Sequence, residues 1–329
     1  MAEIIQAWGF IPVPVDLDPE SMSPLIEQLT ARSSARTRAF LVAHLFGGFI
    51  DLDPIAELCS ARGWALIEDC AQSYDGSGYR GHPQADLTLF SFGSIKSATA
   101  LGGGLSTLRS PQLKAEMCAY RDLLPQQPQA RYALKLLKSL LLKLLSHPEI
   151  YGRVWSLAVR LGLDFDQVLN QSVRGFSGGD LLSQIRQRPS RALVQLLARR
   201  ISQDHQARYQ RRGEMVRALC DNLPEQVWAL GRQARAHSGW IIPVRVQDPA
   251  ALTAHLRAEG YDVTHKSSSM SAIQPTAGFQ EAARASEVFR DVLYLPIYPP
   301  LGLEGYGALG AVIRRYYDDQ REEERARHV

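Results

Sequence analysis

The stretch LIEDCAQSYDGSGYRGHPQADLTLFSFGSIKSATALGGG, residues 66–104, decides the fold. Two short apolar runs, residues 64–67 and 87–92, each stop abruptly at polar or small residues. Such runs are typical of buried parallel strands, and open α/β sheets bind their ligands at the carboxyl ends of these strands. The sequence therefore predicts one crevice that receives an acid, a hydroxyl and an amine: Asp69, Ser91 and Lys96.

The preceding segments alternate between strand and helix. A buried strand is expected over residues 39–45, followed by a helix over 54–62 that Gly63 ends, and then by the first apolar run. This is a βαβ unit, and it implies an α/β fold with a mostly parallel sheet. We also expect a short strand over residues 11–15 and a helix over 21–38.

Composition narrows the class of protein. Of the 329 residues, 45% are hydrophobic and 22% are charged, which is ordinary for a globular protein. The formal net charge of +3 is too small to indicate a nucleic-acid partner. The cysteines have no metal-ligand spacing, and neither a signal peptide nor a membrane-spanning run is visible. We therefore expect a cytoplasmic protein without a metal site.

The pattern D-x-A-Q, then F-S-F-x-x-x-K, then three glycines at 102–104, resembles the core of the DegT/StrS family of pyridoxal-phosphate sugar aminotransferases. The stretch LPIYPPL at residues 295–301 is similar to the family's L-P-x-x-P signature. The resemblance implies a fold-type I large domain, a smaller α+β domain and a homodimer. It rests most strongly on five residues in a fixed order and spacing: Asp69, Ala71, Gln72, Ser91 and Lys96.

The resemblance implies a role for each of these residues. Lys96 would hold pyridoxal 5'-phosphate as a Schiff base and then move a proton between substrate and cofactor. Asp69 would keep the pyridine nitrogen protonated, so that the ring can accept electrons. Ala71 would lie against the ring, Gln72 would contact the ring hydroxyl, and Ser91 would bind the phosphate. Taken alone, each of these residues could be an ordinary helix cap, turn residue or surface residue. The interpretation as a cofactor site depends on their order and spacing.

The implied reaction transfers an amino group, expected to come from glutamate, to a keto-sugar linked to a nucleotide. Such a step belongs to the biosynthesis of surface polysaccharides or antibiotic sugars. A dehydratase of the same family is an alternative, but it would have Lys96 replaced, usually by histidine. Neither the sugar, nor the aminated carbon, nor the donor can be read from the sequence.

A non-catalytic homologue with a regulatory or scaffold role is the third hypothesis. In the family, the motif G-x-x-P-V-x-x-D, here residues 9–16, lies well inside the large domain. The portion before it contributes a helix N-terminus to the phosphate site. We therefore expect this chain to lack the usual N-terminal segment.

Three parts are expected along the chain: a large cofactor-binding domain over 1–125, a helical insertion and linker over 126–213, and a small domain over 214–329. Residues 132–145, rich in leucine and lysine, predict an amphipathic helix. This helix could lie on a membrane surface. We favour a helix packed on the large domain or on a partner subunit, with its lysines reaching water.

Two further expectations concern single features. His44, near the end of the strand expected over residues 39–45, is expected to be a packed structural histidine rather than a catalytic base. A last helix is expected to reach Arg315, and the charged tail after it is expected to fray.

Overall fold

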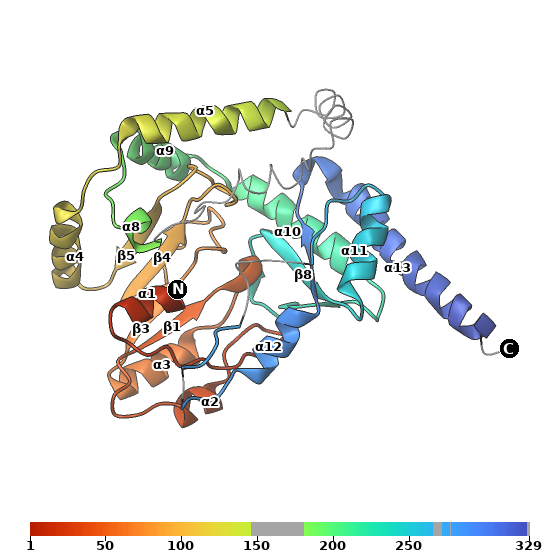
Figure 1. The fold of residues 1–329 in the computed structure, drawn as a ribbon, viewed down its shortest axis with the longest axis horizontal. Helices are drawn as coiled ribbons and strands as arrows, with labels where there is room; N and C mark the ends of the chain where they lie inside the picture. Colours follow the sequence, from red (N-terminus) through yellow and green to blue (C-terminus); the bar gives the residue numbers. More distant parts are fainter. Residues whose placement is uncertain (146–180, 266–271, 277, 328–329) are drawn as a thin grey trace. The chain divides into compact units, whose positions relative to one another are not determined.

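The computed structural model describes residues 1–145, 181–265, 272–276 and 278–327 (Figure 1). The chain forms two compact units: unit 1 comprises Met1–Thr88 and His205–Val329, and unit 2 comprises Leu89–Asp204. The boundary falls inside a strand, β4 (Leu87–Ser91). The predicted division at residues 125 and 213 stays a prediction, and residues 146–180 of its helical insertion lie outside the described residues.

Unit 1 draws its elements from both ends of the chain. The N-terminal segment supplies α1 (Ala2–Ala7), α2 (Ile26–Ala31), β1 (Ala39–Ala43), the 3-10 turn η1 (Leu45–Gly47), β2 (Gly48–Phe49), α3 (Asp53–Arg62) and β3 (Ala65–Asp69). The C-terminal segment supplies α10 (Gln206–Cys220), β6 (Trp228–Ala229), β7 (Ala236–His237), β8 (Ile241–Arg245), α11 (Pro249–Ala258), α12 (Ala283–Arg290), β9 (Val292–Pro296), the 3-10 turn η2 (Pro299–Leu301) and α13 (Gly302–Arg327).

The predicted βαβ unit is confirmed. β1 and β3 pair in parallel, from Ala39 opposite Ala65 to Ala43 opposite Asp69. The crossover helix α3 has a proline in its first turn and ends at Gly63, whose left-handed backbone (φ 64°) suits glycine. The parallel register brings the carboxyl ends of β1 and β3 to the same edge of the sheet.

A second, antiparallel sheet lies at the other end of unit 1. Its strand order is β6-β8-β9, with Ile241 opposite Pro296 and Arg245 opposite Val292. The helices α10, α11 and α13 lie beside it (Figure 1), and their buried residues, such as Leu256 and Tyr306, form one core with the strands.

The first forty residues differ from the prediction. No strand forms over residues 11–15, and the helix predicted over 21–38 covers only Ile26–Ala31. Turn chemistry explains the late start, because the Asp18 carboxylate accepts hydrogen bonds from the Ser21 amide and hydroxyl. These bonds hold the chain in a turn where a helix would otherwise begin.

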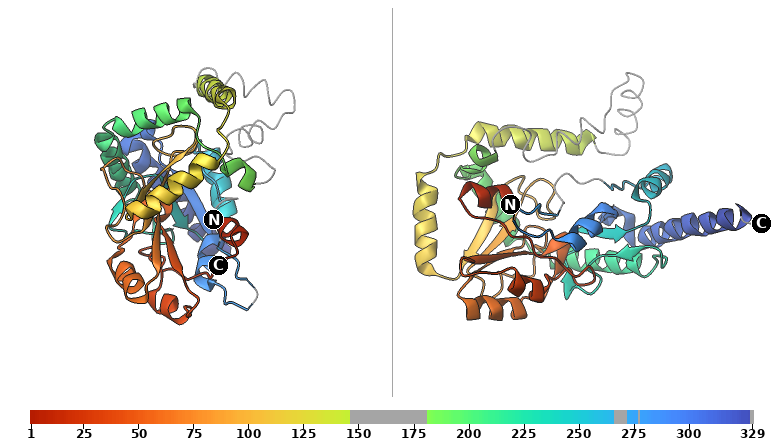
Figure 2. Two further views of the ribbon diagram at one scale, coloured as in Figure 1. Left: turned by 90° about the vertical axis from the view of Figure 1, so that its left-hand side faces the viewer. Right: turned by 60° about the horizontal axis from the view of Figure 1, so that its bottom comes forward.

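The C-terminal tail also differs from the prediction. It does not fray at Arg315, since α13 continues to Arg327 and its last turns extend beyond the other elements of unit 1 (Figure 2). Opposite charges three residues apart, such as Glu322 with Arg325, support a solvated helix. The charge run is therefore helical in the part that the structure describes.

Unit 2 contains the end of β4 and elements that follow it: β5 (Gly104–Leu108), α4 (Pro111–Leu123), α5 (Gln129–Leu145), α8 (Leu181–Ile185) and α9 (Arg191–Ser202). The serines before α4 and α9 cap them, because Ser110 Oγ accepts from the Leu113 amide and Ser190 Oγ from the Leu193 amide. The strand order of the main sheet is β1-β3-β4-β5, in agreement with the predicted α/β class. No helix among the described residues is long and apolar enough to cross a bilayer.

Truncating Leu256 to alanine should lower the free energy of unfolding by about 2–5 kcal/mol, because its fully buried side chain lies in the core of the antiparallel sheet. Denaturant unfolding of Leu256→Ala would measure the loss. Leu303→Ala is the control, since Leu303 is 46% exposed. Equal losses in the two variants would contradict this description of the core.

Candidate active site

β3 ends in two acids whose side chains point to opposite faces of the sheet. Successive side chains in a strand alternate between the two faces. Leu66 and Glu68 are buried at 1% and 0% exposure, whereas Ile67 and Asp69 are half-buried. One acid therefore belongs to the interior, and the other lies on the opposite face of the sheet at the strand end.

The interior acid, Glu68, is surrounded by hydrogen-bond donors. Its carboxylate accepts from His44 Nε2 at 2.9 Å, Tyr79 OH at 2.6 Å, the His82 amide at 2.7 Å, Thr88 Oγ1 at 2.9 Å and Cys70 Sγ at 3.4 Å. Burial alone would raise the pKa of Glu68, but these donors outweigh it and lower the pKa to about 2. Glu68 is therefore a buried anion at neutral pH.

His44 is held at both ring nitrogens. Its Nδ1 accepts a hydrogen bond from the Ile50 amide at 3.2 Å, which leaves Nε2 as the nitrogen that donates to Glu68. The residue is 1% exposed. The structural role predicted for His44 is confirmed, because neither nitrogen is available to take a proton from a substrate.

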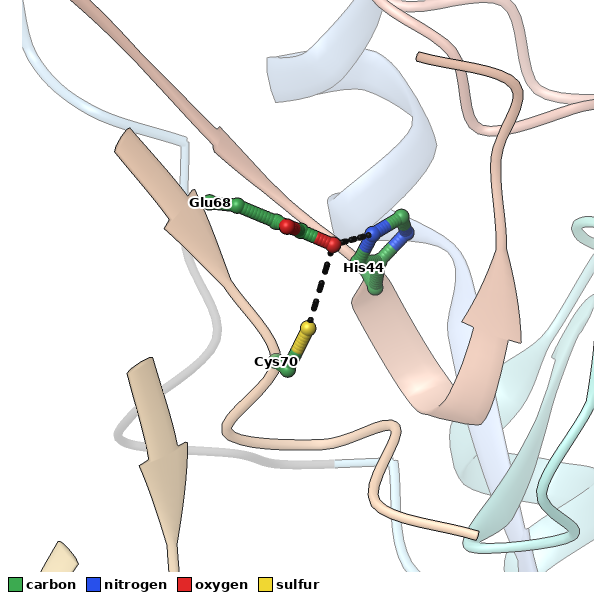
Figure 3. A group of neighbouring side chains, drawn as sticks. All are labelled: His44, Glu68 and Cys70. Atoms are coloured by element: carbon green, nitrogen blue, oxygen red, sulfur yellow. Dashed lines mark hydrogen bonds and ion pairs between the residues drawn. The ribbon is translucent and has the colours of Figure 1, made fainter. Parts of the chain in front are cut away.

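Figure 3 shows His44, Glu68 and Cys70 pointing toward one another, with their ligand atoms within 4.8 Å. This composition could suggest a metal site. Burial and the neighbouring Glu68 charge raise the pKa of the Cys70 thiol, so it stays protonated and is a poor ligand. His44 already uses both nitrogens. The group is a hydrogen-bond network that ties strand ends together.

Asp69, the half-buried acid at the end of β3, begins a turn that contains three of the predicted site residues. Its Oδ1 accepts from the Ala71 amide at 2.8 Å, which fixes the orientation of the carboxylate. Gln72 Oε1 accepts from the Phe46 amide at 2.6 Å, so this side chain holds a residue with positive φ (60°) in η1. Only the amide nitrogen of Gln72 could then donate to a ligand. Unit 1 thus brings Asp69, Ala71 and Gln72 together.

The other two predicted residues lie in unit 2: Ser91 is the last residue of β4, and Lys96 lies in the turn that follows. The Lys96 amide donates to the Gly93 carbonyl at 3.1 Å, which closes a turn. A Cβ atom on Gly93 would lie 3.8 Å from Ser91 Oγ and 3.9 Å from Lys96 Cγ. The serine hydroxyl and the lysine stem therefore lie on the same side of this turn.

The glycines beyond the lysine allow two backbone segments to approach closely. Gly103 has a positive φ of 75°, and a Cβ atom on Gly104 would lie 2.8 Å from the Phe90 carbonyl oxygen. Real Cβ atoms do not come this near to backbone, so β5 can pair beside β4 only with a glycine here.

Two residues that support this loop were missed by sequence reasoning. Tyr132 of α5 donates its hydroxyl hydrogen to the Ala100 carbonyl at 2.7 Å, and Arg200 of α9 donates to the Thr99 carbonyl at 3.1 Å. Both bonds fix the segment between Lys96 and β5. A single sequence gives no signal for contacts that join residues 32 and 101 positions apart.

Residues 1–135 match the model of the DegT/DnrJ/EryC1/StrS aminotransferase family. This segment contains the whole predicted set from Asp69 to Lys96. The predicted resemblance to this family is confirmed over this segment, which is less than half of the chain.

Curated relatives match over a similar segment. GDP-perosamine synthase from Caulobacter vibrioides is 36% identical over 112 residues, which cover 33% of this chain and 30% of that protein. L-glutamine:2-deoxy-scyllo-inosose aminotransferase from Streptomyces fradiae is 34% identical over 106 residues, which cover 31% of this chain and 25% of that protein. The matching segment thus spans less than a third of the length of these relatives.

Solved structures extend the likeness in fold to nearly the whole chain. The aminotransferase TlmJ from Streptoalloteichus hindustanus has a TM-score of 0.67 and 19% identity, and the match covers 97% of this chain and 76% of that one. At this identity the likeness concerns the fold alone. It confirms the predicted α/β fold with a mostly parallel sheet.

Replacing Glu68 by glutamine should remove a pH dependence of stability. The pKa of Glu68 falls from 4.5 to about 2 on folding, so its contribution is complete above pH 4.5 and is lost as the pH falls toward 2. This corresponds to roughly 3 kcal/mol. Unfolding free energies measured between neutral pH and pH 2 should fall less steeply in Glu68→Gln, which should also be less stable at neutral pH.

Asp53→Asn is the matched control, because the Asp53 side chain is 70% exposed and bonds to His82 at the surface. Its stability should follow the wild-type curve. An unchanged curve for Glu68→Gln would mean that Glu68 does not carry the charge described above.

Proposed function

We propose that the protein is a pyridoxal 5'-phosphate-dependent aminotransferase that acts on a nucleotide-linked keto-sugar. One observation carries the proposal: the Ser91 hydroxyl and the stem of the Lys96 side chain lie on the same side of the turn that follows β4. A buried strand that ends in this pair suits a cofactor with both a phosphate and a carbonyl group.

The donor chemistry of the candidate residues fits this cofactor. An amine is needed for the carbonyl, a carboxylate for the protonated pyridine nitrogen, and hydroxyl or amide donors for the phosphate and the ring hydroxyl. Lys96, Asp69, Ser91 and Gln72 offer one group each. Asp69 is already oriented by the Ala71 amide, so little reorganisation would be needed on binding.

The chain's own residues would then have separate roles. Lys96 Nζ would attach the cofactor covalently and later carry the proton to and from the substrate carbon. Asp69 would hold a proton at the ring nitrogen, while the small side chain of Ala71 would leave room for the ring. Gln72 and Ser91 would fix its position through the ring hydroxyl and the phosphate. The bound cofactor would supply a sink for the electrons released at the substrate carbon.

The substrate class is inferred from relatives. The names of GDP-perosamine synthase and of DesI, whose structure was determined in the presence of its TDP-sugar product, both point to nucleotide sugars. We infer an amino-acid donor, glutamate in the first instance, and a role in making surface polysaccharides or antibiotic sugars. We also infer a cytoplasmic homodimer, as the fold-type I resemblance implies.

Titration of the purified chain with pyridoxal phosphate should produce a visible absorption band. Borohydride reduction and peptide mass analysis should then locate the cofactor on Lys96. Lys96→Ala should lose both the band and the adduct, because no other amine occupies its position. Lys114→Ala, which changes an exposed lysine on α4, should keep both.

The role of Asp69 is tested separately. Asp69→Asn should keep the adduct on Lys96 but slow amino transfer from glutamate by roughly a hundredfold or more, since a neutral amide cannot stabilise the ring's positive charge. Wild-type protein that forms no adduct at saturating cofactor would overturn the proposal. A non-catalytic role would then replace it.

A further inference from the structure

The helix α5 presents its leucines to solvent. Tyr132 is its one buried residue, and the residues that follow on the same inward face, Lys135, Ser139 and Leu142, are half-buried. The opposite face carries a stripe of leucines spaced three or four residues apart, each more than half exposed: Leu134 67%, Leu137 63%, Leu140 55%, Leu141 54% and Leu144 55%. Figure 1 draws α5 along the outside of unit 2, beside α9.

This arrangement differs from that of an ordinary surface helix, which turns its leucines inward. Lys135 lies on the inward face, where burial and the charge of Arg131 lower its pKa. The sequence favoured a helix packed on the large domain or on a partner subunit, and in the described part of this single chain the leucine stripe is not packed on the large domain but exposed. An exposed apolar stripe of this size indicates a surface that binds something.

The charges around the stripe are all positive. Arg131 and Lys138 lie one helical turn on either side of Leu134, and Lys143 lies one turn beyond Leu140, each of them exposed. No acid occurs in residues 123–145 or 181–203, the described segments that include α5, α8 and α9. Those two segments carry a set of basic residues: Arg131, Lys135, Lys138, Lys143, Arg186, Arg188, Arg191, Arg199 and Arg200.

We propose that the leucine face of α5 binds the surface of a bilayer that contains anionic lipids. The leucines would enter the boundary between headgroups and acyl chains, and the flanking cations would contact the headgroup phosphates. A second copy of the same face is a poorer occupant, because a symmetric contact would bring the cations of both copies together. The proposal is independent of the aminotransferase function.

Co-sedimentation of the full chain with vesicles tests the proposal. Wild-type protein should bind vesicles of phosphatidylcholine and phosphatidylglycerol in equal parts, and bind vesicles of phosphatidylcholine at least about tenfold more weakly. Leu137→Ser/Leu141→Ser should weaken binding to the anionic vesicles by about tenfold or more. Lys138→Glu/Lys143→Glu should do the same, because each cation near an anionic surface contributes a several-fold gain.

Matched controls lie in unit 1. Ile26→Ser/Leu303→Ser removes two exposed apolar side chains, and Arg321→Glu/Arg325→Glu reverses two exposed charges on α13. Both controls should bind anionic vesicles as the wild type does. Size-exclusion chromatography with light scattering should give the same mass for the leucine variant and the wild type.

Several results would overturn the proposal. One is a wild-type chain that stays in solution with anionic vesicles at low salt. Another is binding to anionic vesicles that the lysine variant loses but the leucine variant keeps. That result would show a general attraction between charges in which the leucines take no part. A smaller mass for the leucine variant would identify the stripe as a contact between subunits instead.

Discussion

The buried negative charge of Glu68 is the constraint on which the rest of the site depends. A carboxylate without water is tolerated only when donors surround it. Here the donors come from four places: the end of β1, the residue after β3, the segment of residues 79–82 and the start of β4. Each has to be in position for the charge to be stabilised, so one side chain fixes the relative positions of all four.

The position of Glu68 in β3 determines where the neighbouring candidate site residue, Asp69, lies. Because side chains alternate along a strand, burying Glu68 turns the next residue, Asp69, to the other face. The turn that Asp69 begins is tied back to η1 by Gln72, which holds Phe46 in its positive-φ conformation. Unit 1 therefore contains the oriented carboxylate of Asp69. Unit 2 contains Ser91 at the end of β4 and Lys96 in the turn after it. These are the groups that the proposed cofactor needs.

Much of this arrangement could be predicted from the sequence. Apolar runs ending in polar residues located β1, β3 and β4, and the ordered motif selected Asp69, Ser91 and Lys96. The role of Glu68 could not be predicted, because its donors are up to 24 residues away. The helix expected over residues 21–38 was shortened by a local turn at Asp18, which outweighs helix propensity. The orientation of α5 was missed because periodicity defines an apolar face but not the direction in which it points.

Hydrogen exchange of Glu68→Gln, measured by mass spectrometry on peptides at neutral pH, tests the central claim most directly. The account predicts faster exchange in residues 44–50, 69–72 and 79–82, where amides such as those of Ile50, Ala71 and His82 depend on the network. The paired strands β8 and β9 should keep their wild-type protection. Wild-type exchange in the first three segments, or an equal loss of protection in β8 and β9, would contradict the claim that Glu68 organises this site.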